Sequence, residues 1–381
     1  MLNSSTGAAV RGSTLQPPGG ISQVISMAKR PTQADVARLA GVSRATVSYV
    51  LNNRTDGRIP ITEQTRQKVL AAVEELGYAP SALARSLKSG TSRTIGFLMP
   101  AVHNPHYWDI LEGAEEEITA QGYYLALVTA NLDLKRERRC LQSLLQQRLD
   151  GLILMPTFID KFTDELQMLS ERNSPVVVIT PMEGADWVFP DIRSGAEAMM
   201  DHLLGLGHRR IAFINGVARR HLSQTRENVY LEKIAAAGLP FDPDLLITCG
   251  YRIRDAYAAA RALLDLDEPP TAIWTVNDLL AVGALRAVHE RGLRVPDDVA
   301  VAGFDDIDLA QQLYPPLTTV HMPALDMGAL AAEFLFERLE NPKCDFMQEL
   351  MPTSLVVRQS TTAVSADAAV MDCFPELEET D

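Results

Sequence analysis

The run SRATVSY over residues 43–49 sets one arginine among short polar side chains. The guanidinium of Arg44 can donate two hydrogen bonds at once, which is how guanine is recognised in the major groove of DNA. Ala45 and Tyr49 are four residues apart, so they share a face if the run is helical. Hydroxyl groups suited to phosphate contacts come from Ser43, Thr46 and Ser48. The run favours DNA recognition; the alternative is an ordinary amphipathic helix packed on its neighbours.

Helix signals on both sides of this run would hold it in place. Thr32 and Asp35 form a capping-box pattern that begins a first helix. Gly41 ends that helix, because glycine tolerates a positive φ. Apolar spacing predicts a second helix over 44–51 and a longer third helix over 63–76. Helix, glycine turn and helix make a helix-turn-helix, whose second helix enters the major groove.

The charges of the chain are distributed unevenly. The whole sequence carries a formal net charge of −14. Residues 28–93 nevertheless hold 11 Lys and Arg against 5 Asp and Glu, a net charge of +6, whereas residues 94–381 carry −21. A short basic block on an acidic body indicates a module that binds a polyanion such as DNA. A solvated charged face would give the same charge count.

Composition places the chain among ordinary globular proteins. Its 381 residues are 46% hydrophobic and 22% charged, enough for two or three domains. No apolar run is long enough to span a membrane, and the first 30 residues lack a signal-peptide pattern. The cysteines stand far apart, at Cys140, Cys249, Cys344 and Cys373. This spacing predicts reduced thiols in a cytoplasmic protein and no metal site.

From residue 94 onward, short apolar runs alternate with amphipathic stretches. The runs include TIGFLMP (94–100), GLILMP (151–156), TAIWTVN (271–277), VAVAGFD (299–305) and SLVVRQS (354–360). Such alternation is typical of α/β folds with a parallel sheet and helices on both faces. The number of runs exceeds one sheet, so we expect two sheets with a cleft between them. Ligands of such folds bind near the carboxyl ends of the strands.

Four stretches together resemble the LacI-type family of bacterial repressors, over about residues 31–360. They are DVARLAGVSRATVSYVLN, LGYAPSALARSLKSGTSRTIGFLMP, NDLLAVGALRAVHERGLRVPDDVAVAGFDDI and PPLTTVHMP. The resemblance implies an α/β fold: an all-α helix-turn-helix head and a two-lobed, periplasmic-binding-protein-like core of doubly wound parallel sheets. It also implies a cytoplasmic, ligand-responsive repressor that binds a near-palindromic operator as a homodimer, without a membrane contact.

Composition and the resemblance divide the chain into five segments. We expect a disordered tail over 1–30, with Met27 as a candidate start, and a helix-turn-helix domain over 31–78. A hinge helix and linker over 79–92, an effector-binding and dimerisation domain over 93–360, and a disordered acidic tail over 361–381 follow.

The resemblance assigns DNA contacts beyond the opening run. The full candidate set is Thr32, Ser43, Arg44, Ala45, Thr46, Ser48, Tyr49 and Asn52, with Ala84, Arg85 and Leu87 of the hinge. By its position, Leu87 would wedge into the minor groove and bend the duplex. Two features depart from the family: Tyr49 stands where an arginine is usual, and the loop over 52–62 is longer. Tyr49 either contacts a phosphate or a thymine methyl, or serves only in packing.

The resemblance also places an effector site between the lobes. By matching position, its residues are His106, Tyr107, Asp191, Arg226, Tyr251, Asn277 and Asp305. A guanidinium, a carboxylate and an amide pair with hydroxyls, while aromatic rings pack on the C–H face of a sugar. A small sugar is therefore the predicted effector, and a nucleobase is the alternative. Trp108 and Trp274 are expected in the core.

Other functions fit the sequence less well. A solute-binding protein of the same fold would need an export signal and no DNA-reading head. An enzyme with an accessory head remains an alternative, but GxxxxGK[ST], HExxH and GxSxG are absent from the sequence. We therefore expect no catalytic residues, no metal and no cofactor.

Overall fold

The chain divides into two compact units, Met1–Lys88 and Ser89–Asp381. The computed structural model describes residues 31–51, 61–78, 91–100, 103–162, 175–216 and 221–362, together with 165, 166 and 169. The predictions for Asn52, Ala84, Arg85, Leu87, residues 1–30 and most of the acidic tail lie outside the described residues.

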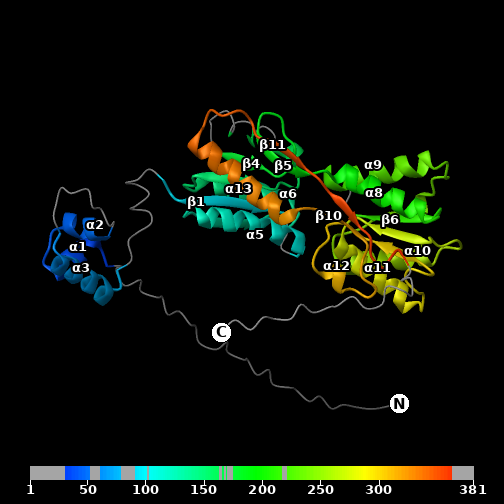
Figure 1. Cartoon of the computed structure of the whole chain (residues 1–381), viewed down its shortest axis with the longest axis horizontal. Helices are drawn as coiled ribbons and strands as arrows, with labels where there is room; N and C mark the ends of the chain where they lie inside the picture. The colour runs from blue at the N-terminus through cyan, green and yellow to red at the C-terminus, as the bar shows by residue number, and fades with distance from the viewer. Residues whose placement is uncertain are drawn as a thin grey trace, which may run out of the picture. The chain divides into compact units, whose positions relative to one another are not determined.

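The first unit contains the three predicted helices (Figure 1): α1 (Gln33–Ala40), α2 (Arg44–Leu51) and α3 (Glu63–Leu76). Valines on all three helices meet in a common core, among them Val36, Val47 and Val69, each with no exposed surface. Gly41 takes a φ of 67°, a conformation that suits glycine, and so turns the chain from α1 into α2. The predicted bounds of the second and third helices are confirmed.

The second unit has two lobes, each built on a parallel sheet. The first-lobe sheet has the strand order β11-β5-β4-β3-β1-β2. Its strands are β1 (Thr94–Met99), β2 (Tyr124–Thr129), β3 (Gly151–Leu154), β4 (Val176–Val178), β5 (Asp186–Pro190) and β11 (Gln348–Met351). Nearly every residue of β1 and β3 is buried, so these strands are covered on both faces of the sheet, as their continuous apolar runs predict.

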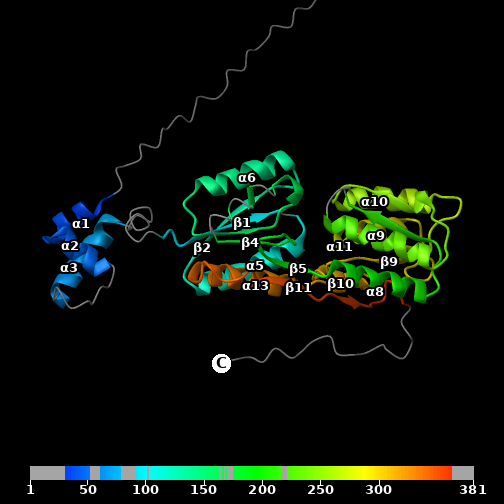
Figure 2. The same ribbon diagram turned by 90° about the horizontal axis from the view of Figure 1, so that it is seen from above.

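Helices cover both faces of the first-lobe sheet (Figure 2). α5 (Pro105–Ala120) and α13 (Ala324–Glu340) lie on one face, and α6 (Leu134–Gln146) lies on the other, near the short η1 (Ile159–Lys161). Gly113 and Gly328 allow α5 and α13 to pack closely. A Cβ atom at either glycine would stand about 2 Å from a backbone carbonyl oxygen of the other helix.

The second-lobe sheet has the order β7-β6-β8-β9. Its strands are β6 (Ile211–Asn215), β7 (Leu246–Thr248), β8 (Ala272–Thr275) and β9 (Ala300–Ala302). Figure 1 shows α8 (Ile192–Gly205) and α9 (His221–Ala236) on one face, and α10 (Ile253–Leu264) and α11 (Asp278–Glu290) on the other. Trp274 of β8 has no exposed surface, which confirms its predicted place in the core.

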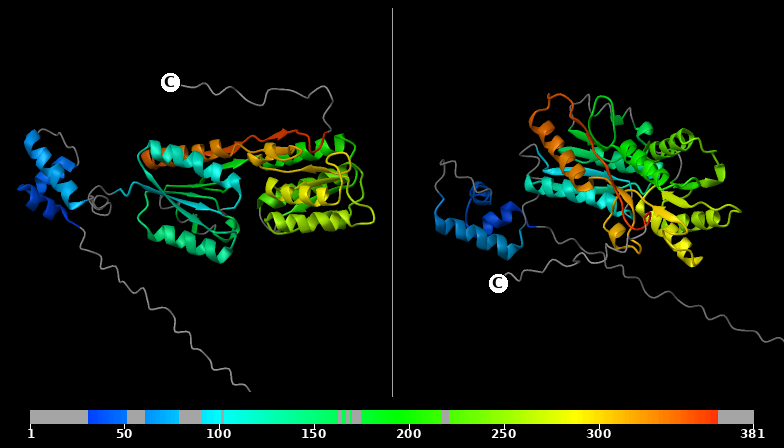
Figure 3. Two further views of the ribbon diagram at one scale, coloured as in Figure 1. Left: turned by 90° about the horizontal axis from the view of Figure 1, so that it is seen from below. Right: turned by 45° about the vertical axis from the view of Figure 1, so that its right-hand side comes forward.

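The chain passes between the lobes three times, at 190–192, 321–324 and 351–354. Two of the crossings adjoin β10 (Thr319–His321) and β12 (Ser354–Val356), which pair antiparallel. The short helices α12 (Leu309–Gln312) and η2 (Pro243–Leu245) complete the second lobe. As a result, α13 belongs to the first lobe although it follows the second in sequence (Figure 3). The alternation of runs did not predict β5, β10 or β11.

The predicted boundary at residue 360 falls inside the fold. Ser360 and Thr361 are buried, and Thr361 Oγ1 lies 2.8 Å from both Thr318 Oγ1 and His202 Nε2. The second lobe therefore includes Thr361, one residue beyond the predicted start of the tail. No helix within the described residues is long and apolar enough to span a membrane.

Candidate functional site

The second helix of the head presents a polar face to solvent. Arg44 and Ala45 are exposed in its first turn, while Val47 and Val50 point into the core of the head. Ser43 caps the helix, since its Oγ accepts the Thr46 N–H at 3.1 Å. The buried valines fix the orientation of the helix, so the exposed first turn is available to a duplex.

The remaining predicted DNA contacts in the described part of the head differ in exposure. Thr32 is exposed, and its N–H and Oγ1 both donate to Asp35 Oδ2, so the capping box is confirmed. Ser48 and Tyr49 are half-buried. The partial exposure of Tyr49 leaves both of its predicted roles open.

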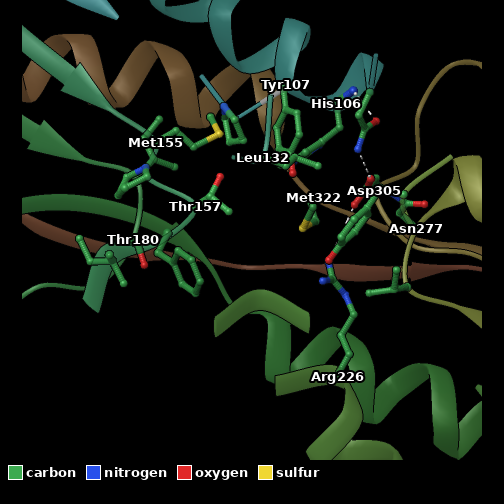
Figure 4. A pocket seen from close by; sticks show the side chains of 18 residues that line it. His106, Tyr107, Leu132, Met155, Thr157, Thr180, Arg226, Asn277, Asp305 and Met322 are labelled. Carbon is green, nitrogen blue, oxygen red and sulfur yellow. Dashed lines mark hydrogen bonds and ion pairs between the residues drawn. The ribbon is translucent and has the colours of Figure 1, made fainter. Parts of the chain in front are cut away.

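A cavity of about 770 Å³, part of it open to solvent, lies between the two lobes of the second unit. Six of the seven predicted effector residues line it: His106, Tyr107, Arg226, Tyr251, Asn277 and Asp305. Figure 4 shows Arg226, Asn277 and Asp305 at one end, with Met155, Thr157 and Thr180 at the other.

Asp191 is the predicted effector residue that does not line the cavity. It follows β5 directly and caps α8, where its Oδ1 accepts the Ser194 N–H at 3.1 Å. Its backbone carbonyl accepts the Thr353 hydroxyl at 2.8 Å. Asp191 thus joins two crossings between the lobes. The predicted place of this acidic residue at a crossover agrees with the structure. Its predicted role as a ligand contact is not supported, because Asp191 does not line the cavity.

Arg226 and Asp305 form a buried pair at the second-lobe end. Arg226 is 4% exposed and Asp305 is 5% exposed, and Arg226 Nη2 lies 3.8 Å from Asp305 Oδ1. The guanidinium also stacks on Phe304, with its Cζ 3.9 Å from the ring centroid. Burial lowers the pKa of Arg226, and the nearby Asp305 carboxylate opposes that change. An arginine stays protonated even so.

Asp305 also connects the lobes. Its Oδ2 accepts a hydrogen bond of 3.1 Å from Asn104 Nδ2, at the N-terminus of α5 in the first lobe. Its backbone N–H donates to Val320 at 3.0 Å, and its φ is 111°. A positive φ at a residue other than glycine is strained, and such strain is concentrated at functional sites.

Two further polar residues complete this end of the cavity. Asn277 caps α11, since its Oδ1 accepts the Leu280 N–H at 3.0 Å. Asn277 is 6% exposed and lines the cavity. His106 is buried, and burial lowers its pKa, so its imidazole is neutral at pH 7.

Tyr251 depends on a glycine for its position. A Cβ at Gly216 would lie 2.0 Å from Tyr251 Cζ, so no other residue fits there without moving the ring. Tyr251 and Tyr107 each bring an aromatic ring to the cavity.

Sequence reasoning missed several cavity residues. Asn104 precedes a proline at a helix start, and Thr157 and Thr180 follow the carboxyl ends of β3 and β4. The rule that ligands bind at these strand ends would have suggested the two threonines. Trp108, expected in the core, is 41% exposed on α5 and does not line the cavity.

Comparison with known proteins agrees with this architecture. Residues 32–81 match the bacterial regulatory proteins of the lacI family, and residues 200–361 match a periplasmic binding protein-like domain. The transcriptional repressor PurR of Photobacterium profundum is 35% identical over 335 residues, which cover 86% of this chain and 98% of the relative. The ribose operon repressor of Escherichia coli K12 is 37% identical, with 87% and 99% covered.

The chain belongs to the LacI family. Among solved structures, the lac repressor dimer bound to operator and the anti-inducer ONPF is similar with a TM-score of 0.76 at 26% identity, covering 87% of this chain and 99% of that one. The CelR–cellobiose complex is similar with a TM-score of 0.63 at 31% identity, covering 87% and 100%. This LacI-family chain is a transcription regulator that binds DNA and a small-molecule effector.

Proposed function

We propose that this LacI-family protein is a cytoplasmic repressor that binds a near-palindromic operator as a homodimer and responds to a neutral sugar. The observation that carries the sugar assignment is the buried Arg226–Asp305 pair in a cavity with aromatic walls. Arg226 and Asp305 carry opposite charges, and His106 is neutral. The lining residues are therefore electrically balanced, and a neutral ligand preserves that balance.

An anionic effector is disfavoured by the same geometry. A carboxylate or phosphate near Arg226 would also approach Asp305, and the described cavity lining holds no second cation. Sugar hydroxyls instead accept from Arg226 and Asn277 and donate to Asp305, while Tyr107 and Tyr251 offer ring faces to C–H groups. The E. coli ribose repressor and the CelR–cellobiose complex, both similar to this chain, are named for sugars.

A nucleobase is the second candidate. The similar P. profundum protein is a PurR repressor, and a flat base would fit against Tyr107 or Tyr251. We favour the sugar because the three polar groups Arg226, Asn277 and Asp305 gather at one end, where adjacent hydroxyls can satisfy them together.

DNA recognition is proposed to use two copies of the head. Arg44 at the exposed start of α2 reads a guanine, and two-fold symmetry of the dimer matches the half-sites of the operator. The lac repressor structure cited above is a dimer on its operator, which supports this arrangement. The hinge residues Ala84, Arg85 and Leu87 are proposed to contact the minor groove.

Coupling between the two activities is proposed to pass through Asp305. This residue accepts from Asn104 of the first lobe and faces the ligand space of the second, so a bound ligand competes for it. A change at this contact alters how the lobes are held together. The resulting free energy is reciprocal: the effector changes operator affinity as much as the operator changes effector affinity.

The test combines two measurements on the full chain. Isothermal titration with monosaccharides, disaccharides and nucleobases identifies the effector class, and a gel shift on DNA upstream of the protein's own gene measures operator binding with and without the ligand that binds. We expect a sugar to bind and to change the shift. Binding of nucleobases alone would reject the sugar, and turnover of the bound ligand would revive the enzyme alternative.

A further inference from the structure

One hydroxyl group at the first-lobe end of the cavity is buried without a hydrogen-bond partner. Thr157 Oγ1 makes no hydrogen bond within the described residues. Thr180, whose side chain is 6% exposed, lies at the same end of the cavity (Figure 4). Burying a hydroxyl without a partner costs about 1–3 kcal/mol. Both residues line the cavity, so a ligand can satisfy the Thr157 hydroxyl.

The backbone beneath Thr157 is held firmly by Glu137. This glutamate of α6 has no exposed surface, and its two carboxylate oxygens accept the Thr157 N–H at 3.0 and 3.1 Å. Its Oε1 also accepts the Phe158 N–H at 3.1 Å. Hydrogen bonds to a charged acceptor are stronger than neutral ones. The carboxylate therefore fixes the turn after β3 and with it the position of the Thr157 hydroxyl.

Apolar side chains line the cavity together with its threonines. Met155, Ile159, Ile179 and Leu132 are among the lining residues, and Figure 4 shows Met155 and Thr157 at the end away from Arg226. A single sugar ring bound at Arg226 would leave Thr157 unsatisfied. A longer ligand can lay C–H groups on the apolar side chains and bring a second set of hydroxyls to the threonines.

We propose that Thr157 is a second recognition point for the effector, that Glu137 is its positioning residue, and that the effector is a neutral glycoside of two linked sugar units. One unit pairs with Arg226, Asn277 and Asp305, and the other places a hydroxyl on Thr157. This inference rests on the proposed sugar effector and adds its length and the residue that selects for that length.

Titration of the full chain tests the proposal with named sugars. Cellobiose, maltose and lactose are compared with glucose, galactose and ribose. We expect one disaccharide to bind at least about 10-fold more tightly than either of its own monosaccharides, as one added hydrogen bond and apolar contact would give.

Variants at Thr157 decide whether its hydroxyl carries that difference. Thr157→Val keeps the shape and removes the hydroxyl, so it should weaken disaccharide binding by about 5- to 10-fold and leave monosaccharide binding unchanged. Thr157→Ser keeps the hydroxyl and should bind like the parent. Thr119→Val makes the same change at an exposed site on α5 and is the matched control.

Glu137→Leu tests the positioning role through the same ratio. It removes the oxygen that accepts the Thr157 and Phe158 N–H groups, so the disaccharide preference should shrink while monosaccharide affinity stays at the parent value. A general loss of structure would lower both affinities together. If this variant does not fold, the Val and Ser variants at Thr157 still decide the proposal.

The outcomes separate the two levels of inference. If no sugar binds the parent chain, the sugar effector is wrong and the second recognition point falls with it. If sugars bind, but monosaccharides bind as tightly as disaccharides or Thr157→Val has no effect, only the second recognition point is overturned.

Discussion

The head and the two-lobed body place their proposed recognition groups in opposite environments. In the head, Arg44 and Ala45 are exposed, and the buried valines beneath them carry the stability. In the body, Arg226, Asn277 and Asp305 are at most 6% exposed and are each held by neighbouring groups. Recognition in the head is therefore separable from folding, whereas in the body the same side chains serve both.

The largest effect is expected where a buried charge is removed. Arg226→Met leaves the Asp305 carboxylate buried without its cation, so effector affinity should fall by at least about 30-fold and the melting temperature should drop. Titration and thermal unfolding measure both. Arg286→Ala, at an exposed arginine of α11 paired with Glu290, is the control and should change neither. Unchanged effector binding in Arg226→Met would contradict the assigned site.

The matching change in the head should affect binding alone. Arg44→Ala removes the proposed guanine contact of about 1–3 kcal/mol, which is about 5- to 150-fold in operator affinity. Because the side chain is exposed, the melting temperature and effector affinity should stay at parent values. Arg38→Ala, at an exposed arginine on α1, is the control. A lowered melting temperature would show that the head is not separable in this way.

A smaller effect on operator affinity is expected from a change in the hinge. Leu87→Ala removes the proposed wedge, so operator affinity measured by gel shift should fall severalfold, because less of the bending cost is recovered by contacts. Effector binding should be kept. Unchanged operator affinity would reject the wedge, and the predicted role of Leu87 with it.

A pH-dependent effect should appear only in the body. Burial first, and the nearby Asp305 carboxylate second, raise the pKa of Asp278 well above the usual value of about 3.9 for an aspartate. The folded state therefore keeps a proton that the unfolded state releases, so stability falls as pH rises above about 3.9 toward the folded pKa. Asp278→Asn can keep the hydrogen bonds with Thr319 and Ile307, so it should gain stability over the parent more at pH 8 than at pH 5.

The control for that measurement is an exposed aspartate. Hydrogen bonds from Arg294 lower the pKa of Asp298 to about 2, so it is ionised at both pH values. Asp298→Asn should shift the melting temperature equally at pH 5 and pH 8. An equal shift for Asp278→Asn as well would mean that Asp278 does not hold a proton.

The smallest effect is expected at Tyr49. Replacing it by arginine, the residue usual in the family, should change preference at one base position of an operator library by at most about 1 kcal/mol, the low end of a base contact. The half-buried ring leaves room for either role. Identical preferences for Tyr49→Arg and the parent would show that Tyr49 serves only in packing.

Local signals predicted much of the fold. The caps and apolar spacing predicted α2 and α3 at their bounds, and the apolar runs predicted the buried strands. By contrast, β11 is mostly exposed and pairs with β5, about 160 residues earlier, so no local pattern marks it. The family resemblance, and not spacing, placed Arg226 and Asp305 together. The unpartnered hydroxyl of Thr157 is visible only in three dimensions.

The threefold crossing of the chain sets the order in which the parts can be completed during synthesis. The helices of the head are contiguous, so that unit can fold soon after residue 78 emerges from the ribosome. The first lobe must wait for α13 and β11, which end at Met351, and the second lobe must wait for Thr361. Both lobes are thus finished within ten residues of each other. A nascent chain therefore acquires its DNA-reading unit long before the effector-controlled body that regulates it.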